Sequence, residues 1–464
     1  MNARIVLFLG PRGDDEETSY ARLDRLDQAT GAQTRLPWNV LVDDCQESCP
    51  GAHIHVLIIG SELAYREWQG YLQQDAKDAG YPDRCKIPIA FVRYNEAALN
   101  PSNRDVFWRF FQNLRLALGG DPISHLDEFS IAEKSSAERF SQEADYVCVD
   151  ITRGFRAAPF LGASALAFAQ ASNRRRGRTV RHRIYYAAKD AEQNRIIPIW
   201  DLTPFVEGVE LSDALDAFSR HGRADDLAMF FKNSQITEVI KLAEPMRQFA
   251  DDLLLMRIPN LLKDSAPAVQ QALSESFDYL KDAYPSVSND LQDFRDQIDQ
   301  LAPNGVGPDP VSLDGLKAAA VLADRLWFTR RYAELYGLLR ESLLTAFTVV
   351  YVAEPHLQPN RLDQKKFADQ RAQIEQSWFP LLEKSKFSES CVQKKPRFIL
   401  TFNTSSIDDA RKIAKQIDDF SRLRNDVAHC SMGTKPNKEE ELRAELKNSL
   451  DAYKSLVEAL VCRQ

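Results

Sequence analysis

The chain has 464 residues, 44% of them hydrophobic and 27% charged, a composition typical of a globular protein with two to three domains. Its net charge of −8 excludes a broad basic surface that tracks phosphates, so an RNA or nucleotide partner would be held by a few focused cations. Because the N-terminus lacks a signal-peptide layout and no apolar stretch approaches the ~18 residues of a membrane span, we expect a cytoplasmic protein without a membrane partner.

Short apolar runs alternate with helical patterns in the first half of the chain. The runs that are typical of buried strands cover residues 3–10, 53–60, 86–93, 146–149 and 183–188. Helices are expected from Ser61, a cap-like residue, through Trp68, then around 104–118 and from Pro159 to Ala171. This alternation predicts an open, mostly parallel α/β sheet of the Rossmann type.

Sheets of this type bind ligands beyond the carboxyl ends of their strands. Several turns that follow the predicted strands would therefore share one edge of the sheet. They contain small residues, whose backbone N–H groups can approach a phosphate, and cations that neutralise it. The candidate ligand-binding residues are Gly10, Pro11, Arg12, Gly60, Ser61, Thr152, Arg153, Gly154, Arg156 and Lys189.

Two features bear on the assignment of these turns to a nucleotide site. The turn at residues 150–156 can also be a purely structural strand-to-helix connection in which Asp150 caps the next helix, and the residues alone favour neither possibility. The first turn, GPRG, lacks the GxGxxG pattern of dinucleotide-binding folds. A dinucleotide-dependent oxidoreductase is correspondingly disfavoured.

The basic run RRRGR at residues 174–178, followed by Arg181 and Arg183, is the most concentrated positive charge in the chain. It follows a helix that begins at the ligand edge, so it should lie at the opposite end of the sheet. Arginines there would complement the C-terminus of that helix. We therefore expect a solvated charged turn at this position rather than an RNA-binding patch.

From about residue 224 the pattern changes to amphipathic helices, and the second half of the chain is predicted to be all-α. The expected helices cover residues 225–262, 265–283, 288–301, 313–353, 363–386, 404–429 and 437–461.

Cysteines and histidines give no metal-binding pattern. No CxxC pair occurs, so the cysteines are expected to be free thiols, and no histidine forms a ligand pair with a carboxylate cluster. Three histidines, His53, His55 and His221, are expected to be structural. The positions are Cys45, Cys49, Cys85, Cys148, Cys391, Cys430 and Cys462, and His53, His55, His125, His182, His221, His356 and His429.

The segment RNDVAH at residues 424–429 carries the groups needed to cut RNA. RNA supplies its own nucleophile, the 2′-hydroxyl, so cleavage needs a proton acceptor or donor, which His429 can be, and a fixed cation such as Arg424. No metal is required. On a helix Asn425 and His429 share a face, but Arg424 lies about 140° from His429. Two copies of the helix meeting across a two-fold axis could bring these groups into one cleft.

Two motifs resemble those of a known protein family. The segment VCVDITRGFRAAP resembles the Asp-x-Thr-His-Gly motif of CRISPR-associated proteins, with Arg153 in place of the usual His. RNDVAH is similar to the R-x4-H motif of HEPN ribonucleases, which are commonly fused to the CARF sensor domain of that family. Further segments that resemble the family are GSELAYREW, YYAAKD, IPIWDLTPF, LDAFSRHGRADDL and LYGLLRESLLTAF, the last containing Arg340 and Glu341.

The resemblance implies a CARF-like sensor domain at residues 1–224, a helical linker region at 225–312 and a HEPN domain at 313–464. It further implies a homodimer or higher homo-oligomer that acts in type III CRISPR antiviral defence. A cyclic oligoadenylate, expected to be the tetra-adenylate, would bind the candidate ligand residues and activate metal-independent cleavage of single-stranded RNA. No other cofactor is implied. Arg424 and His429 would be catalytic, with Asn425 in support.

Two other functions remain open at this point. The chain could be a nucleotide-sensing regulatory module whose helical half only dimerises or docks a partner. Alternatively, it could be a ring nuclease that degrades the cyclic oligoadenylate with help from Thr152 or Lys189. The linear products of such a ring nuclease would survive the change His429→Ala.

Overall fold

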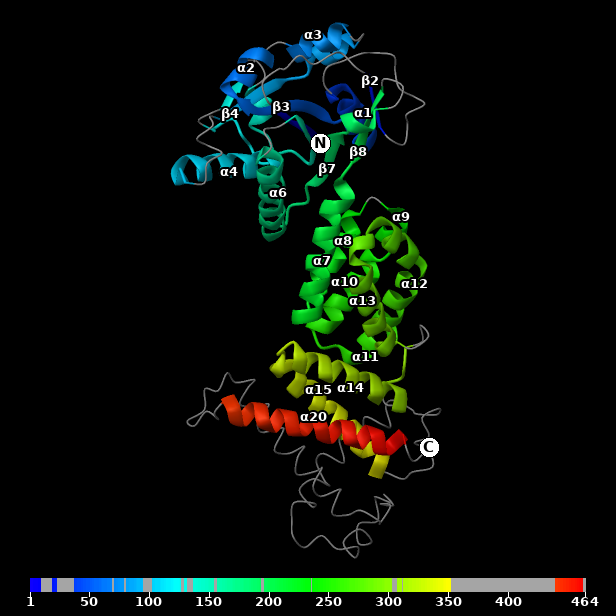
Figure 1. Cartoon of the computed structure of the whole chain (residues 1–464). Helices are drawn as coiled ribbons and strands as arrows, with labels where there is room; N and C mark the ends of the chain where they lie inside the picture. Colours follow the sequence, from blue (N-terminus) through cyan, green and yellow to red (C-terminus); the bar gives the residue numbers. More distant parts are fainter. Residues whose placement is uncertain are drawn as a thin grey trace, which may run out of the picture. The chain divides into compact units, whose positions relative to one another are not determined.

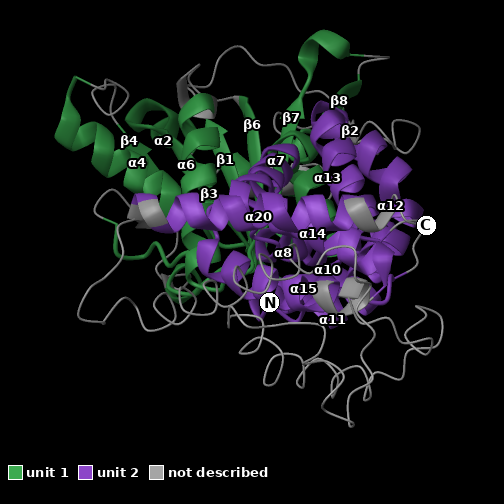
Figure 2. Ribbon diagram, turned by 90° about the horizontal axis from the view of Figure 1, so that it is seen from below, with its two compact units in different colours: residues 1–207 green, residues 208–464 purple. Residues whose placement is uncertain are grey.

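The chain forms two compact units in the computed structural model, a sheet unit at Met1–Glu207 and a helical unit at Gly208–Gln464 (Figure 2). The division falls inside one helix, α7 (Thr203–His221), upstream of residue 224. The division of the chain into sensor, linker and nuclease parts stays a prediction. The structure describes residues 1–9, 19–22, 37–68, 71–78, 81–94, 102–126, 129–131, 137–153, 157–192, 196–234, 236–302, 307–310, 312–351 and 439–461.

An eight-stranded sheet in the order β2-β8-β7-β6-β1-β3-β4-β5 forms the centre of the sheet unit (Figure 1). Its strands are β1 (Asn2–Leu9), β2 (Ser19–Arg22), β3 (His53–Ser61), β4 (Ile89–Tyr94), β5 (Phe129–Ile131), β6 (Tyr146–Arg153), β7 (Arg181–Ala187) and β8 (Ile196–Asp201). The five predicted strands are present as β1, β3, β4, β6 and β7, and they are parallel to one another. The sheet as a whole is mixed, because β5 is antiparallel to β4 and β8 to β7.

Helices cover both faces of the sheet. Along β1, Ile5 and Leu7 belong to one core together with residues of α1, whereas Val6 and Phe8 belong to a second core with residues of α4 and α6. This alternation follows from the two-residue period of a strand. Continuous apolar runs in the central strands are therefore required by burial on both faces. The helices are α1 (Trp38–Ser48), α2 (Glu62–Trp68), α3 (Tyr71–Asp78), α4 (Arg104–Leu118), α5 (Ala137–Phe140) and α6 (Ala157–Arg175).

A buried arginine and histidine pair lies near the amino ends of β1 and β3. Arg4 donates from Nε to Nε2 of His55 at 3.0 Å and from Nη1 to the carbonyl of Ala117 at 2.9 Å. Burial, reinforced by the charge of Arg4, holds the pKa of His55 well below its ordinary value. On β7, burial lowers the pKa of His182 to about 4, although Nε2 of this ring lies 2.8 Å from the carbonyl oxygen of Leu118.

These two histidines make the sheet unit sensitive to acid. The ordinary pKa of histidine is 6.5, and well above that pH both rings are neutral in the folded and in the unfolded chain. Below pH 6.5 the histidines of the unfolded chain bind protons, whereas those of the folded unit do not. We expect stability to fall between about pH 6.5 and about 4, with roughly 3 kcal/mol from His182 alone. Urea unfolding at several pH values measures this loss. The change His182→Gln removes the titrating ring and should reduce this loss, and a flat wild-type profile would contradict the prediction.

The described part of the helical unit contains α-helices and short 3-10 and π turns. They are α8 (Asp225–Asn233), α9 (Thr237–Ile240), α10 (Ala243–Leu254), α11 (Ile258–Asn260), α12 (Ala266–Ala283), α13 (Ser288–Leu301), α14 (Leu313–Phe328), α15 (Tyr332–Tyr351) and α20 (Glu439–Val461), with the π turn Leu261–Ser265 before α12 and the 3-10 turn Pro285–Val287 before α13. Three predicted helices, 265–283, 288–301 and 437–461, are present within one or two residues. The predicted helices 363–386 and 404–429 lie outside the described residues.

Two of the predicted long helices are each divided into shorter ones, so the predicted lengths of these helices were wrong. The span 225–262 is divided into α8 to α11, and α10 ends before Met256, which has a φ of +53°. The span 313–353 is divided at Arg330, with a φ of +59°, between α14 and α15. A left-handed residue stops a helix, and because neither position is a glycine, no local signal marks either break.

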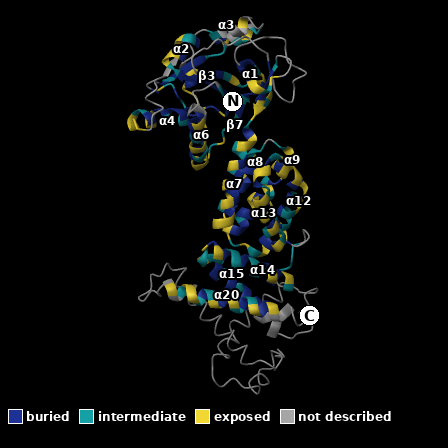
Figure 3. Cartoon of the chain, viewed as in Figure 1, coloured by how far each residue is buried: buried dark blue, intermediate teal, exposed yellow. Residues whose placement is uncertain are grey.

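The last helix packs on two earlier ones. Helix α20 contacts α14 and α15, which lie side by side with it in Figure 1. The Tyr453 hydroxyl donates to the carbonyl of Leu316 at 2.8 Å, and Lys454 pairs with Asp324 at 2.6 Å. The apolar stripes of these helices point into one core, seen as dark blue in Figure 3. Residues more than 100 positions apart are thereby fixed to one another.

Candidate functional site

The candidate site residues divide into two groups. Those that the structure describes are Gly60, Ser61, Thr152 and Lys189, together with the backbone of Arg153. Those that lie outside the described residues are Gly10, Pro11, Arg12, Gly154, Arg156, Arg424, Asn425 and His429. The geometry of the nuclease motif therefore stays a prediction, whereas part of the sheet edge can be built from its residues.

Strand register aligns the described candidates at the carboxyl edge. Leu9, the last residue of β1, pairs with Gly60 on one side and with Arg153 on the other. The chain order reverses between β1 and β6, because β3 and β4 extend the sheet in one direction and β6 and β7 in the other. Such a switch point leaves a crevice where ligands bind in open α/β sheets.

Gly60 is required by close packing at this edge. A Cβ atom on it would lie 2.9 Å from the carbonyl oxygen of Leu9 and 3.1 Å from the Cβ of Ala64. The next residue, Ser61, accepts a hydrogen bond from the amide of Ala64 at 3.2 Å and so caps α2, as predicted. The pair thus brings a strand end, a helix start and the end of β1 together.

A β-bulge lies in β6 at the predicted DITR turn. Leu7 of β1 pairs with Asp150 of β6, and the next paired residues are Leu9 and Arg153. One residue separates the two pairs on β1 and two residues separate them on β6, so β6 carries one extra residue. Oδ1 of Asp150 accepts hydrogen bonds from the amide of Thr152 at 2.9 Å and from its hydroxyl. Asp150 lies within β6 and does not cap α6, which begins at Ala157, so that interpretation was wrong.

The Thr152 hydroxyl also joins two strands. Its oxygen accepts from the amide of Ala187 on β7 at 2.8 Å, beyond Asp150 and Tyr185, the last residues paired between β6 and β7. The hydroxyl has a single proton, which is donated to Asp150. A phosphate oxygen only accepts hydrogen bonds, so it could bind this hydroxyl only if the bond to Asp150 were given up. Thr152 therefore shapes the edge rather than offering it a free donor.

Two cations lie at the carboxyl ends of β7 and β4, the strands beyond β6 and β3 on either side of the switch point. Lys189 follows β7 in a short 3-10 turn and is exposed. Arg93 pairs in register with Gly60 from β4 and was not among the candidates, although the predicted strand ended on it. Its guanidinium lies 3.1 Å from the carboxylate of Glu62 and 5.0 Å from the ring centre of Tyr65. The position at a strand end was the signal that could have identified it.

The basic run lies at the opposite end of the sheet, as predicted. Arg176 and Arg178 both pair with Asp121, at 2.9 and 2.8 Å, and the amide of Arg181 donates to the carbonyl of Asp145, just before β6 begins. Arg174 lies in the last turn of α6. Arg178 also pairs with Glu143 at 3.3 Å, so two of these cations are balanced by two carboxylates and the run is a structural connection.

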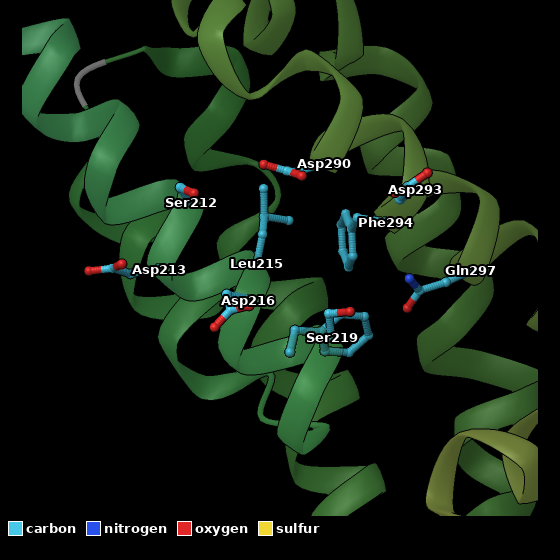
Figure 4. Close-up of a pocket in the computed structure, with 10 residues that line it drawn as sticks. Ser212, Asp213, Leu215, Asp216, Ser219, Asp290, Asp293, Phe294 and Gln297 are labelled. Atoms are coloured by element: carbon cyan, nitrogen blue, oxygen red, sulfur yellow. The ribbon is translucent and has the colours of Figure 1, made fainter. Parts of the chain in front are cut away.

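The helical unit contains a pocket of about 340 Å³ between α7 and α13 (Figure 4). Its walls carry four carboxylates, from Asp213, Asp216, Asp290 and Asp293. Of these, Asp216 pairs with Arg220 at 2.6 Å. Such a lining repels phosphates, so the pocket is neither an RNA nor a nucleotide site. No cluster of three or more potential metal ligands occurs among the described residues.

Comparisons with known proteins identify no family. No family model and no curated protein matches the chain. One solved structure that resembles it is Enterococcus italicus Csm6 bound to cyclic hexa-2′-fluoro-hexa-dAMP, at 10% sequence identity, over 99% of this chain and 94% of that one, with a TM-score of 0.42. In the part of the chain that the structure describes, no helix is long and apolar enough to cross a membrane.

Proposed function

We propose that the protein is a ribonuclease activated by a cyclic oligoadenylate, with a CARF-like sensor and a HEPN-like catalytic region, acting in type III CRISPR defence. The observation that carries the proposal is the presence of two motifs in the expected order, DITRGFR at residues 150–156 and RNDVAH at 424–429. Either motif alone is a weak signal, but together they combine a phosphate site with groups for RNA cleavage in one chain. The position of β6 beside the switch point supports the first assignment.

In this proposal the messenger lies along the carboxyl edge of the sheet. Its phosphates need N–H donors and cations, which the turns at residues 10–12 and 153–156, Ser61 and Lys189 can provide. Arg153 contributes a permanent charge where the resembled family has an imidazole. Thr152 keeps the bulge in place by its bonds to Asp150 and Ala187.

Cleavage follows from the chemistry of RNA itself. His429 takes the proton from the 2′-hydroxyl or gives one to the leaving oxygen, and Arg424 stabilises the charge that builds up on the phosphorane. Asn425 supports the pair. Since Arg424 and His429 diverge by about 140° on one helix, the active arrangement needs two chains. A messenger bound to both sensors can alter how these chains meet, which is an allosteric coupling between distinct sites.

The experiment is to incubate the protein with labelled single-stranded RNA in EDTA, alone and with cyclic tetra-adenylate or cyclic hexa-adenylate. We expect cleavage to increase at least ~10-fold with one ring size, because a coupling of 1–3 kcal/mol changes an equilibrium by 5–150-fold. Linear tetra-adenylate serves as the control ligand. Absence of cleavage under every condition would contradict the nuclease assignment and leave a sensor without catalytic output.

A further inference from the structure

A second pocket of the helical unit, of about 320 Å³, lies between α7, α13 and α14. Its wall is mostly apolar and includes Leu301, Val321, Leu322 and Phe328, the last of which is 73% exposed at the end of α14. This volume is at the lower end of the ~300–1,000 Å³ that small-molecule sites occupy. The pocket therefore suits a small ligand with an apolar body.

One guanidinium in this wall has no ionic partner among the described residues. Asp324, the other charged residue of the wall, pairs with Lys454 at 2.6 Å. The central carbon of the Arg325 guanidinium lies 4.0 Å from the centre of the Phe218 ring. Its Nη2 donates to the Phe218 carbonyl at 2.5 Å and its Nη1 to the side chain of Gln297, whereas Nε has no hydrogen-bond partner. The wall thus carries one positive charge that no described carboxylate balances.

The contacts of Arg325 compensate its charge only in part. Burial lowers the pKa of Arg325 to about 10. The carbonyl of Phe218 lies in the last turn of α7, where a helix carries a partial negative charge of about half a unit. A buried charge is costly unless it is paired with an opposite one. An anion bound in the pocket would supply the missing negative charge.

The neighbouring pocket limits the charge of that anion. The two pockets share Phe218, Ser219 and Gln297, and the neighbouring one has four carboxylates in its walls (Figure 4). These carboxylates repel every additional negative charge on a ligand. A ligand with one negative charge and an apolar body therefore fits better than a phosphate with two.

We infer that this pocket binds a monocarboxylate with an apolar chain, of the medium-chain fatty acid class. Its carboxylate pairs with Arg325, and its chain lies against Val321 and Phe328. None of the lining residues belongs to the motifs at residues 150–156 and 424–429. The inference therefore goes beyond the proposed function and does not depend on it.

Calorimetric titration of the full-length protein with octanoate tests the site, at concentrations below those at which octanoate forms micelles. We expect saturable binding of octanoate, with octanol at least ~10-fold weaker because it has the same chain without the charge. Octyl phosphate should also bind more weakly than octanoate. Arg325→Met keeps an apolar stem without the charge, so it should weaken octanoate binding by about 10–100-fold, the range that a hydrogen bond to a charged group contributes.

A second variant leaves Arg325 and its contacts in place. Phe328→Asp changes an exposed side chain, so the fold should be retained, and its carboxylate should repel octanoate and weaken binding at least ~10-fold. The matched control is Phe205→Asp, because Phe205 is 74% exposed and does not line the pocket. Octanoate should bind this control with wild-type affinity.

Four results would overturn the inference: no binding of octanoate to the wild type, equal binding of octanol, tighter binding of octyl phosphate, or equal affinities in Phe328→Asp and Phe205→Asp. The titration contains neither RNA nor messenger. A protein that binds octanoate as described but never cleaves RNA would retain this site while the proposed function fails. A messenger-activated nuclease without octanoate binding would refute this site alone.

Discussion

Replacing His429 with alanine is expected to reduce messenger-activated RNA cleavage to background, a loss of about 10²–10⁴-fold, because general acid and base catalysis contributes factors of that size. Arg424→Ala should cost about 10²–10³-fold, since it removes the cation that stabilises the phosphorane. Both variants should retain the dimer and bind the messenger with wild-type affinity. Single-turnover cleavage of labelled RNA in EDTA measures the loss.

The controls separate catalysis from folding. Arg424→Lys keeps the charge but loses the planar guanidinium, so it should be intermediate in rate. His221→Ala removes an exposed imidazole from the end of α7 and should leave cleavage unchanged. Full activity of either the His429 or the Arg424 alanine variant would exclude RNDVAH as the catalytic centre. Loss of messenger binding in these variants would instead indicate a folding defect.

Replacing Thr152 with valine is expected to loosen the edge of the sheet by about 2–4 kcal/mol. Valine has the same shape but no hydroxyl, so the amide of Ala187 loses its acceptor and buried Asp150 loses a donor. Unmet hydrogen bonds at buried groups cost about 1–3 kcal/mol each. Thr152→Ser keeps the hydroxyl and should cost less than about 1 kcal/mol.

Hydrogen exchange at the Ala187 amide reports this loss directly. In Thr152→Val its exchange should be accelerated by about 30–1,000-fold, the factor that corresponds to 2–4 kcal/mol. The amide of Ile5, in the centre of the sheet, is the internal reference and should change less. If the valine and serine variants exchange alike at Ala187, the hydroxyl does not hold the two strands. Messenger titration of both variants then shows whether the bulge matters for binding.

The central sheet could be predicted because its strands are long apolar runs. Three strands were missed, and each lacks such a run. Strand β2 has four residues, β5 has three, and β8 contains Pro198 and ends in Asp201. Their pairing depends on neighbours supplied by the rest of the sheet, which no local pattern reports.

The candidate edge was predicted from strand ends, whereas its detailed structure was not. Gly60 and Ser61 follow from local rules of close packing and helix capping. The bulge at Thr152 depends on the amide of Ala187, 35 residues further along the chain, and no local signal encodes that partner. The position of the basic run, in contrast, could be predicted, because the order of strands and helices alone places Arg176 and Arg178 at the end of the sheet opposite the ligand edge.

The bulge in β6 has a practical consequence for transplanting this site into another scaffold. The regular register fails beyond Asp150, because the extra residue makes Arg153 rather than Thr152 the backbone partner of Leu9. Asp150, Thr152 and the Ala187 amide, which donates to the Thr152 hydroxyl, would have to be transferred together.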